Sequence, residues 1–388
     1  MLHTIQNHAQ ALLPELISLS KNLYDRPELG HQEHYACEQH TALLSKYGFT
    51  LEQPYVGMAT AFKATYSSGK PGPTIAFLAE YDALPGIGHG CGHNILGATS
   101  TGSAIVLRQL IDELGGTVVV LGTPAEETDG GKAAIADSGD LKNIDIALMA
   151  HPSNTYCRSG SSLALMPLRF EFFGQTSHAA ASPEMGINAL HAVISLFNNI
   201  SALREHLRSD CRIHGVIKDG GKAANIVPEY TMAEFFVRAT TKTYLNELVQ
   251  KVTNCANAAA LSNGATLKIS QFEASYDNMI TNQLLSDLFT AKLLEVGVPH
   301  VEDARPSTGS SDAGNVSQCC PMIHSYFDIT NNPSVASHTR EFASASITDY
   351  ANEQMKKTIL AFVLTAVELI RRPELVAEAK AEFARTEK

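Results

Sequence analysis

The amino-acid sequence predicts an α/β fold in which helices cover a mostly parallel sheet, with a smaller α+β domain inserted into the chain. Three observations lead to this prediction. Residues 74–79, 117–121 and 146–150 are short apolar runs of strand length, and the helical stretch Ala98–Leu114 separates the first two. Strands and helices that alternate in this order are typical of βαβ units in a parallel sheet. A chain of 388 residues is also more natural for two domains than for one.

The helices of the larger domain follow from apolar spacing and from the residues that end them. Apolar residues within 13–24 recur close to the helical period, and Pro27 follows them. The helix Ala98–Leu114 runs into two consecutive glycines, which commonly end helices. A final helix is expected at 352–371, and the charged tail after Pro373 is expected to fray.

The inserted domain is expected at 168–276, so that 1–167 and 277–388 together form the larger domain. A strand and two helices of the insert are expected at 169–173, 188–204 and 244–261. With further strands between the helices, this order of elements is typical of a small α+β unit.

Charge and composition exclude several classes of function. The formal net charge is −11, whereas binding to nucleic acid or to an anionic membrane requires clustered lysine and arginine. No apolar run reaches the roughly 20 residues that cross a bilayer, and the first residues lack the features of a signal peptide. The seven dispersed cysteines are typical of reduced thiols. We therefore expect a cytoplasmic protein with no nucleic-acid and no membrane partner.

Each of the three predicted strands leads into polar side chains. Glu80 and Asp82 follow the first strand, Glu126 and Glu127 follow the second, and His151 follows the third. Ligands of open α/β sheets bind outside the carboxyl ends of the strands. We therefore expect the three groups of side chains to meet in one crevice.

The strongest local signal is the glycine-rich segment Gly88–Asn94, which carries Cys91 and His93 two residues apart. Glycines allow the backbone to turn so that both side chains face one point. A thiolate and an imidazole together suit zinc and the neighbouring first-row metals. The alternative for such a pair is a tight turn with a buried cysteine, but the strand before the segment and the donors after it favour a metal site.

The other candidate donors have ordinary interpretations as well. Two adjacent glutamates such as Glu126 and Glu127 are usually a solvated surface pair, although their position after an apolar strand argues against that here. If both line a site, one can bind metal while the other stays available as a base. His151 is either a core histidine or a ligand, and spacing alone leaves His338 as a histidine in a surface loop.

The run Ala79–Pro85, followed by Gly90–Asn94, resembles the amidohydrolase branch of the aminoacylase/carboxypeptidase-G metallopeptidase family. That branch includes hippurate, auxin-conjugate and p-aminobenzoyl-glutamate hydrolases. Five further motifs match in order, namely Pro27–Gly30, Pro124–Glu127, Ser177–Ala180, Asn225–Pro228 and Ser311–Ser317. The resemblance implies a phosphorylase/hydrolase-like catalytic domain with an inserted lid and dimerisation domain.

The resemblance also implies the residues of the site. The implied ligands of two divalent metal ions are Cys91, His93, Glu127, His151 and His338. Zinc or manganese is expected, with cobalt or nickel as alternatives. Glu126 is the implied general base, and Asp82 is implied to orient the ring of a ligand. Many members of the branch have aspartate after the Cys-Gly-His segment, whereas this chain has Asn94, so the local hydrogen bonds are expected to differ.

Within the insert, the resemblance implies residues that contact the substrate. His178 matches a residue that reaches the active site of a partner subunit in a dimer, although a capping or loop histidine is the alternative. Asn225, Arg238 and His214 are implied to bind the substrate, and the planar donors of arginine suit a carboxylate. Segments 212–217 and 309–317 are most similar to the p-aminobenzoyl-glutamate hydrolase and β-alanyl-lysine dipeptidase subgroup.

The function implied is hydrolysis of an amide bond in a small N-acyl amino acid or dipeptide. Two metals would activate a shared water, Glu126 would accept its proton, and a metal and His178 would stabilise the oxyanion. One alternative is a thiol hydrolase that uses Cys91 as nucleophile. Another is a dimeric scaffold that binds metal without catalysis, although Glu126 would then have no purpose. The sequence shows no phosphate-binding loop and no dinucleotide fingerprint.

Overall fold

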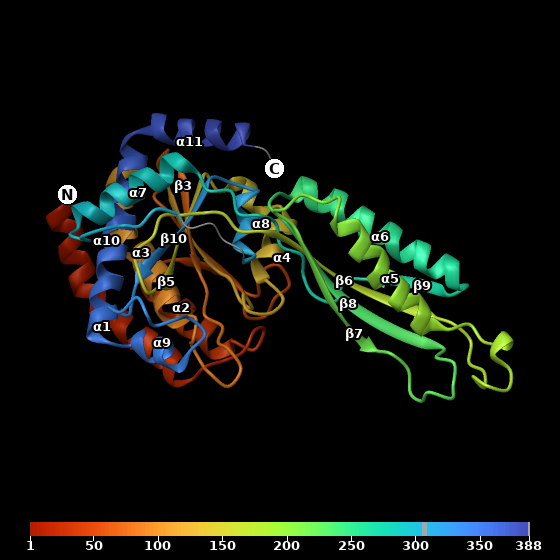
Figure 1. The fold of residues 1–388 in the computed structure, drawn as a ribbon. Coiled ribbons are helices and arrows are strands. Elements are labelled where there is room, and N and C mark those ends of the chain that lie inside the picture. The colour runs from red at the N-terminus through yellow and green to blue at the C-terminus, as the bar shows by residue number, and fades with distance from the viewer. Residues whose placement is uncertain (305–308, 387–388) are drawn as a thin grey trace. The chain divides into compact units, whose positions relative to one another are not determined.

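The computed structural model describes residues 1–304 and 309–386. Residues 305–308 and 387–388, which belong to the predicted segment 277–388, lie outside the described residues. The chain divides into two compact units (Figure 1). The first unit comprises Met1–Ser161 and most of the chain from Met279 onward, and the second comprises Ser162–Asn278 together with Gly309 and Ser310. Each unit is described below by itself.

The first unit is built around a six-stranded sheet with the order β1-β2-β4-β3-β5-β10. Its strands are β1 (Thr50–Glu52), β2 (Phe62–Ser67), β3 (Thr74–Ala79), β4 (Thr117–Gly122), β5 (Ile146–Ser153) and β10 (Met322–Asp328). Strands β3, β4, β5 and β10 are parallel, whereas β2 pairs antiparallel with both β4 and the edge strand β1. The prediction of a mostly parallel sheet is therefore confirmed.

Helices cover both faces of this sheet. Alternate residues of each strand point to opposite sides, and apolar residues on both sides are buried against helices. Ile75 and Phe77 of β3 join the core formed with α1, α3 and α10, whereas Ala76 and Leu78 join the core formed with α4 and α8. The helices of the unit are α1 (Leu2–Asp25), α2 (His34–Lys46), α3 (His93–Leu114), α4 (Gly131–Ser138), α7 (Gln283–Glu295), α8 (Ala313–Ser317), α9 (Arg340–Ala345), α10 (Asp349–Arg371) and α11 (Pro373–Arg385), and a short 3-10 helix spans Asp140–Asn143.

The tail after Pro373, expected to fray, forms the helix α11. Proline suits the first turn of a helix because its fixed φ is already helical and the missing N–H would have no partner there. The Glu382 carboxylate accepts hydrogen bonds from the backbone N–H groups of Gln283 and Leu284 at the start of α7, and Val376 and Ala379 are buried. Tertiary contacts that the local sequence does not reveal therefore hold this helix.

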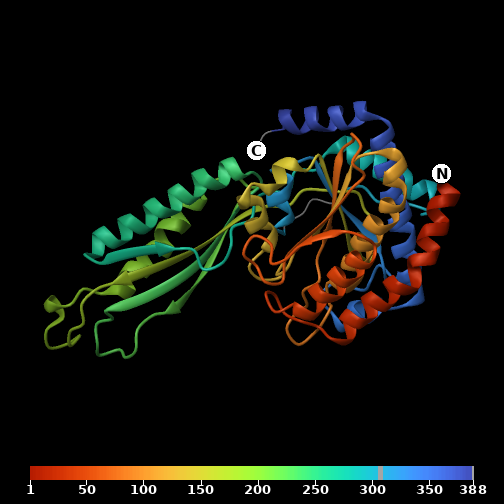
Figure 2. The same ribbon diagram turned by 180° about the vertical axis from the view of Figure 1, so that it is seen from behind.

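The second unit is a four-stranded antiparallel sheet with the order β7-β8-β6-β9. The helices α5 and α6 lie on the same side of this sheet (Figures 1 and 2), and they bury a separate core against it. Its elements are β6 (Ala164–Phe173), a 3-10 helix (Pro183–Met185), α5 (Ala189–Arg204), β7 (Arg212–Asp219), β8 (Tyr230–Ala239), α6 (Lys242–Asn263) and β9 (Thr266–Ser270). An α+β organisation of this segment is thus observed.

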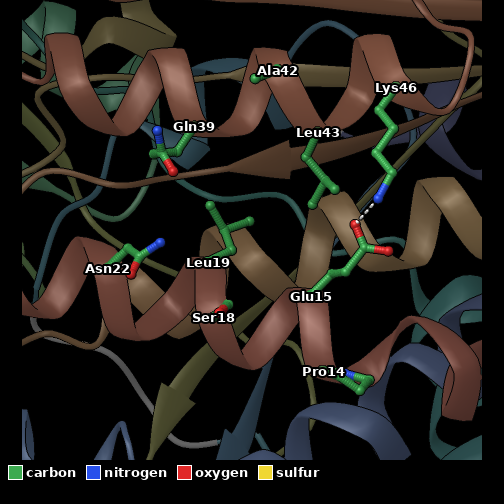
Figure 3. Close-up of a pocket in the computed structure, with 9 residues that line it drawn as sticks. All are labelled: Pro14, Glu15, Ser18, Leu19, Asn22, Gln39, Ala42, Leu43 and Lys46. Carbon is green, nitrogen blue, oxygen red and sulfur yellow. Dashed lines mark hydrogen bonds and ion pairs between the residues drawn. The ribbon is translucent and has the colours of Figure 1, made fainter.

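A surface groove of about 430 Å³ lies between α1 and α2 in the first unit. Glu15 and Lys46 form an ion pair across it, with 2.6 Å between Oε2 and Nζ (Figure 3). None of the residues that line the groove is a candidate ligand or catalytic residue. In the part of the chain that the structure describes, no helix combines the length and the apolar character needed to span a membrane.

Candidate metal centre

The centre begins where β3 ends. Glu80 and Asp82 follow the last residue of this strand, and both side chains are fully buried. Glu80 Oε1 lies 2.7 Å from the ammonium of Lys132, and Glu80 Oε2 lies 3.1 Å from His93 Nε2. Burial opposes ionisation of Glu80, but Lys132 and His93 outweigh it and lower the pKa of this carboxyl to about 2. The strand end therefore presents fixed negative charge.

The glycine-rich segment next to it turns the chain into helix α3, which begins at His93. Gly92 lies in the left-handed region at φ 78°, and a Cβ built on it would lie 2.8 Å from Pro152. Glycine is therefore required here both by the backbone conformation and by the space. This turn places Cys91 and His93 next to each other at the end of the sheet.

Asp82 holds two parts of the centre together. The Nδ1–H of His93 donates to the Asp82 carboxylate and to its backbone carbonyl, each at 3.0 Å. The other Asp82 oxygen accepts the backbone N–H of Glu127 at 2.9 Å. Because Nδ1 faces only acceptors, it carries the proton and Nε2 is left as the metal-binding nitrogen, in the manner of a carboxylate–histidine–metal triad.

His93 Nε2 makes no hydrogen bond within the described residues, although Glu80 Oε2 is 3.1 Å away. If His93 Nε2 carries no proton, then it and Glu80 Oε2 are two buried acceptors facing each other, and a proton or a cation is needed between them. Burial disfavours the imidazolium, but the carboxylates of Glu80 and Asp82 outweigh it and raise the pKa of His93 well above its ordinary value. A metal ion at Nε2 would satisfy the same demand.

A second set of potential metal ligands surrounds the Cys91 thiol. Its Sγ lies 3.5 Å from Nε2 of His151 and 3.5 Å from Nε2 of His338. His338 Nε2 is also 3.6 Å from Glu127 Oε1, an oxygen that is buried and has no hydrogen-bond partner within the described residues. Potential ligand atoms lie within 4.8 Å of one another in the groups Cys91–His93–His151, Cys91–Glu127–His338 and His93–Glu126–Glu127.

His151 was expected just after the third predicted strand, whereas the structure places it within β5. Its Nδ1 donates to the carbonyl of Pro152 at 2.7 Å, which directs Nε2 toward Cys91. Burial lowers the pKa of His151 to about 3, so the ring is the neutral form that binds metals.

Two residues of the centre adopt left-handed backbone conformations that are uncommon without glycine. Ala125, directly before the glutamate pair, has φ 61°, and His338 has φ 63°. Hydrogen bonds maintain both: the Ala125 N–H donates to the buried Glu33 carboxylate at 2.8 Å, and the His338 N–H donates to the Gly90 carbonyl at 2.8 Å. Such strain at a cluster of polar side chains is typical of a functional site.

Glu126 is half-buried, and its Oε1 accepts a hydrogen bond of 2.9 Å from the Ser311 hydroxyl. Burial, together with the carboxylates of Glu80 and Asp312, raises the pKa of Glu126 well above its ordinary value, although Lys132 and His93 oppose this effect. The carboxyl therefore has an environment that increases its affinity for a proton.

The sequence did not identify Lys132 or His324 as part of this region, and Asp312 was noted only within a motif. Lys132 and Asp312 are both fully buried and joined by an ion pair. The His324 ring lies 5.7 Å from that of His151. Lysine side chains are mostly exposed in folded proteins, so the sequence around Lys132 gave no reason to expect that this lysine is buried.

The four candidates of the insert lie in the second unit. The His178 Nδ1 accepts the backbone N–H groups of Ala180 and Ala181 at 3.3 and 3.1 Å. The carbonyl of Asn225 accepts the N–H of Ala179, which places Asn225 beside this turn. Arg238 on β8 donates to the Ser310 hydroxyl at 2.8 Å. Burial, and to a smaller extent the Arg238 charge, lowers the pKa of His214 on β7.

The donors of the first unit fit divalent first-row metals. They combine one thiol, three imidazoles and carboxylates. Among the described residues, Glu127 Oε1 and His93 Nε2 are buried without hydrogen-bond partners. Asn94, which departs from the common aspartate, donates to the hydroxyls of Ser20 and Ser346 at 3.0 Å, away from these donors.

Comparisons with known proteins agree with this chemistry. The family model of peptidase family M20/M25/M40 matches residues 71–360. A mouse (Mus musculus) protein named Xaa-Arg dipeptidase is 35% identical over 387 residues, which cover 94% of this chain and 88% of the mouse protein. One of the subunits of p-aminobenzoyl-glutamate hydrolase from Escherichia coli is 30% identical over 302 residues, which cover 72% of this chain and 62% of that protein.

Solved structures share the fold. The aminobenzoyl-glutamate utilization protein of Klebsiella pneumoniae matches with a TM-score of 0.76 at 19% identity, over 94% of this chain and 98% of that one. A Bacillus subtilis protein described as a dinuclear metal binding peptidase from the M20 family matches with a TM-score of 0.66 at 18% identity, over 92% and 99%. The family model matches residues 71–360, and the mouse relative is 35% identical over 94% of this chain. This chain therefore belongs to peptidase family M20/M25/M40.

Proposed function

We propose that this protein is a dinuclear metallo-amidohydrolase that cleaves the amide bond of a small N-acyl amino acid or dipeptide. Metal-dependent hydrolysis of amide bonds in small substrates is the activity indicated by the family and by the named relatives. The observation that carries the proposal is the convergence of potential metal-ligand atoms around the Cys91 thiol and His93 Nε2. Two of these atoms, His93 Nε2 and Glu127 Oε1, are buried and make no hydrogen bond within the described residues. The thiol-hydrolase and non-catalytic alternatives are not favoured by these comparisons.

The proposed protein ligands of two divalent metal ions are Cys91, His93, Glu127, His151 and His338. Zinc and manganese are the proposed metals, with cobalt or nickel as alternatives, because thiolate and imidazole donors suit these ions. When bound, the ions would supply Lewis acidity for the attacking water and the amide carbonyl.

Glu126 is the proposed general base. Its carboxyl lies next to the ligand Glu127, and its Oε1 is held by the Ser311 hydroxyl. The same surroundings raise its pKa and so favour acceptance of a proton from the attacking water. Glu126 is then proposed to return this proton to the leaving nitrogen. Asp82 is proposed as a positioning residue that fixes the His93 ring and the Glu127 backbone.

His178 is the proposed oxyanion donor. Because its Nδ1 accepts two backbone N–H groups, the proton of the ring lies on Nε2, where it can be donated to a developing negative charge. We propose that it acts on the site of a partner subunit in a homodimer. Arg238, Asn225 and His214 are the proposed contacts of the substrate, with the Arg238 guanidinium on its carboxylate.

Two observations support the proposed substrate class. The relatives are named as an Xaa-Arg dipeptidase and a p-aminobenzoyl-glutamate hydrolase, and the proposed chemistry of the centre is hydrolysis of an amide bond. A dipeptide or acylated amino acid has the free carboxylate that Arg238 would bind. A cytoplasmic location and the absence of nucleic-acid or membrane partners are proposed from the charge and composition of the chain.

Two neighbouring substitutions test the division of roles at the glutamate pair. Glu126→Gln removes a proton acceptor without removing a proposed ligand, so kcat is expected to fall by about 100- to 10,000-fold while bound metal is unchanged. Glu127→Gln, the matched variant next to it, is expected to lower the metal content. The measurements are turnover of a panel of dipeptides and N-acyl amino acids, and elemental analysis of the purified variants. Near-normal turnover in Glu126→Gln would refute the assignment.

A further inference from the structure

Lys132 is a fully buried lysine whose charge the proposed reaction does not use. It is the second residue of α4, and its Nζ lies 2.7 Å from Glu80 Oε1 and 2.5 Å from Asp312 Oδ1. The second Asp312 oxygen accepts the backbone N–H of Lys132 at 2.9 Å, so the aspartate holds both ends of the residue. The ammonium is therefore fixed between two buried carboxylates.

The carboxylates around this ammonium have the arrangement of a cation site. Oxygen atoms of Glu80, Glu126 and Asp312 lie within 4.8 Å of one another, close enough to hold one metal ion. Burial opposes the charge of Lys132, but Asp312, Glu80 and Glu126 outweigh it and raise its pKa. Lys132 is thus a cation already present where three acidic side chains meet.

This cluster is continuous with the proposed metal centre on two sides. Glu80 Oε2 faces His93 Nε2 at 3.1 Å, and Ser311, the neighbour of Asp312, donates to Glu126. A divalent ion bound among the three carboxylates would take Glu126 as a ligand, and a carboxylate bound to a metal is a much weaker proton acceptor. An ion pair buried at this depth is also a poor source of stability compared with apolar packing, which points to a functional role.

We propose that Lys132 occupies a cation position beside the metal centre, and that it thereby excludes a further divalent ion and keeps Glu126 unligated. The inference rests on the proposed role of Glu126. Lys132 contacts Glu80 and Asp312, and its proposed effect on the reaction is exerted through Glu126, so it is a positioning residue.

The first test replaces the ammonium with an apolar side chain of similar length. Lys132→Met is expected to bind one more Mn²⁺ per chain than the unchanged protein at saturating Mn²⁺, and its kcat is expected to fall about 100-fold or more as that ion binds Glu126. Adding Asp312→Asn to Lys132→Met should abolish the additional ion. Lys21→Met, which removes an exposed lysine paired with Asp25, is the control and should leave the metal count and turnover unchanged.

The second test leaves Lys132 in place. Asp312→Asn alone is expected to leave the number of bound Mn²⁺ ions unchanged, because Asp312 holds the lysine rather than a metal. Loss of an ion from this variant would overturn the inference, as would an unchanged ion count in folded Lys132→Met. If Lys132→Met does not fold, the ion count of Asp312→Asn decides. The counts are independent of turnover, so a failure of the proposed hydrolase function is distinguishable from a failure of this inference.

Discussion

At the scale of single residues, the centre depends on groups that orient the donors as much as on the donors themselves. Asp82 illustrates this, since its two oxygens hold the His93 ring and the Glu127 backbone. Carboxylates of this kind fix the tautomer of a ligating histidine and increase its basicity. The affinity for metal should therefore depend on a residue that is not itself a proposed ligand.

Replacing Asp82 tests this dependence. Asp82→Ala is expected to weaken metal binding by about 10- to 100-fold, because His93 and Glu127 lose their common support. Competition with a chelator measures the dissociation constant. Asp137→Ala, at an exposed aspartate of α4, provides the control. Equal metal affinity in both variants would show that Asp82 has no such role.

Sequence patterns pointed to candidate residues of this centre where a motif or a strand end marked them. Cys91, His93 and the glutamate pair stand in such contexts, and the structure gathers them with His338, which is 247 positions from Cys91 in the chain. Spacing could not predict that approach, and the resemblance to a known family supplied it. Lys132 escaped prediction because its burial depends on carboxylates beside β3 and α8 that only the fold brings together.

At the scale of elements, helix α3 must approach the end of β3 closely for the centre to form. A Cβ on Gly97 would lie 2.7 Å from the backbone carbonyl of Glu80 and 2.7 Å from Nε2 of the buried His40. At Gly102, further along the same helix, the nearest atoms are instead the flexible ends of Leu16 and Ile359. The two glycines therefore differ in what surrounds them.

This difference predicts unequal effects of the same substitution. Gly97→Ala is expected to lower the free energy of unfolding by about 1–3 kcal/mol, because the backbone of Glu80 cannot move aside easily. Gly102→Ala should cost less, since side-chain ends can adjust and alanine favours the helix. Urea unfolding of both variants measures the difference, and equal losses would contradict this explanation.

The sequence predicted the central strands β3, β4 and β5 and the long helices because their apolar patterns are strong and uninterrupted. It did not predict β1, β2 or β10. Strand β1 has only three residues, and β10 alternates buried and half-buried positions, so its apolar character is diluted. Helix α11 was missed for a different reason, since its stability depends on contacts with α7.

At the scale of the whole molecule, the proposed reaction requires residues from both units. The candidate ligands and Glu126 belong to the first unit, whereas His178, Asn225 and Arg238 belong to the second. Of these residues, His178 is the one proposed to act on the centre of a partner subunit in a homodimer. The assembly is thus part of the proposed mechanism.

Mixing two inactive variants tests this proposal. His178→Ala is expected to reduce turnover by about 100- to 1,000-fold, as removal of an oxyanion donor does. In a mixed dimer with Glu126→Gln, one site would have both an intact Glu126 and an intact His178 from its partner. After subunit exchange, activity should return to about a quarter of the unchanged level, because half of the dimers are mixed and each has one working site. If exchange is demonstrated and no activity returns, His178 does not act in trans.

The most direct test of the central claim is the turnover of a dipeptide and N-acyl amino acid panel by metal-stripped protein, before and after addition of zinc, manganese or cobalt. We expect activity to disappear with the metal and to return with at least one of these ions, because the Cys91 and His93 donor sets are proposed to bind them. Turnover that survives complete removal of metal and is lost on alkylation of Cys91 would contradict the proposed mechanism and favour a thiol hydrolase.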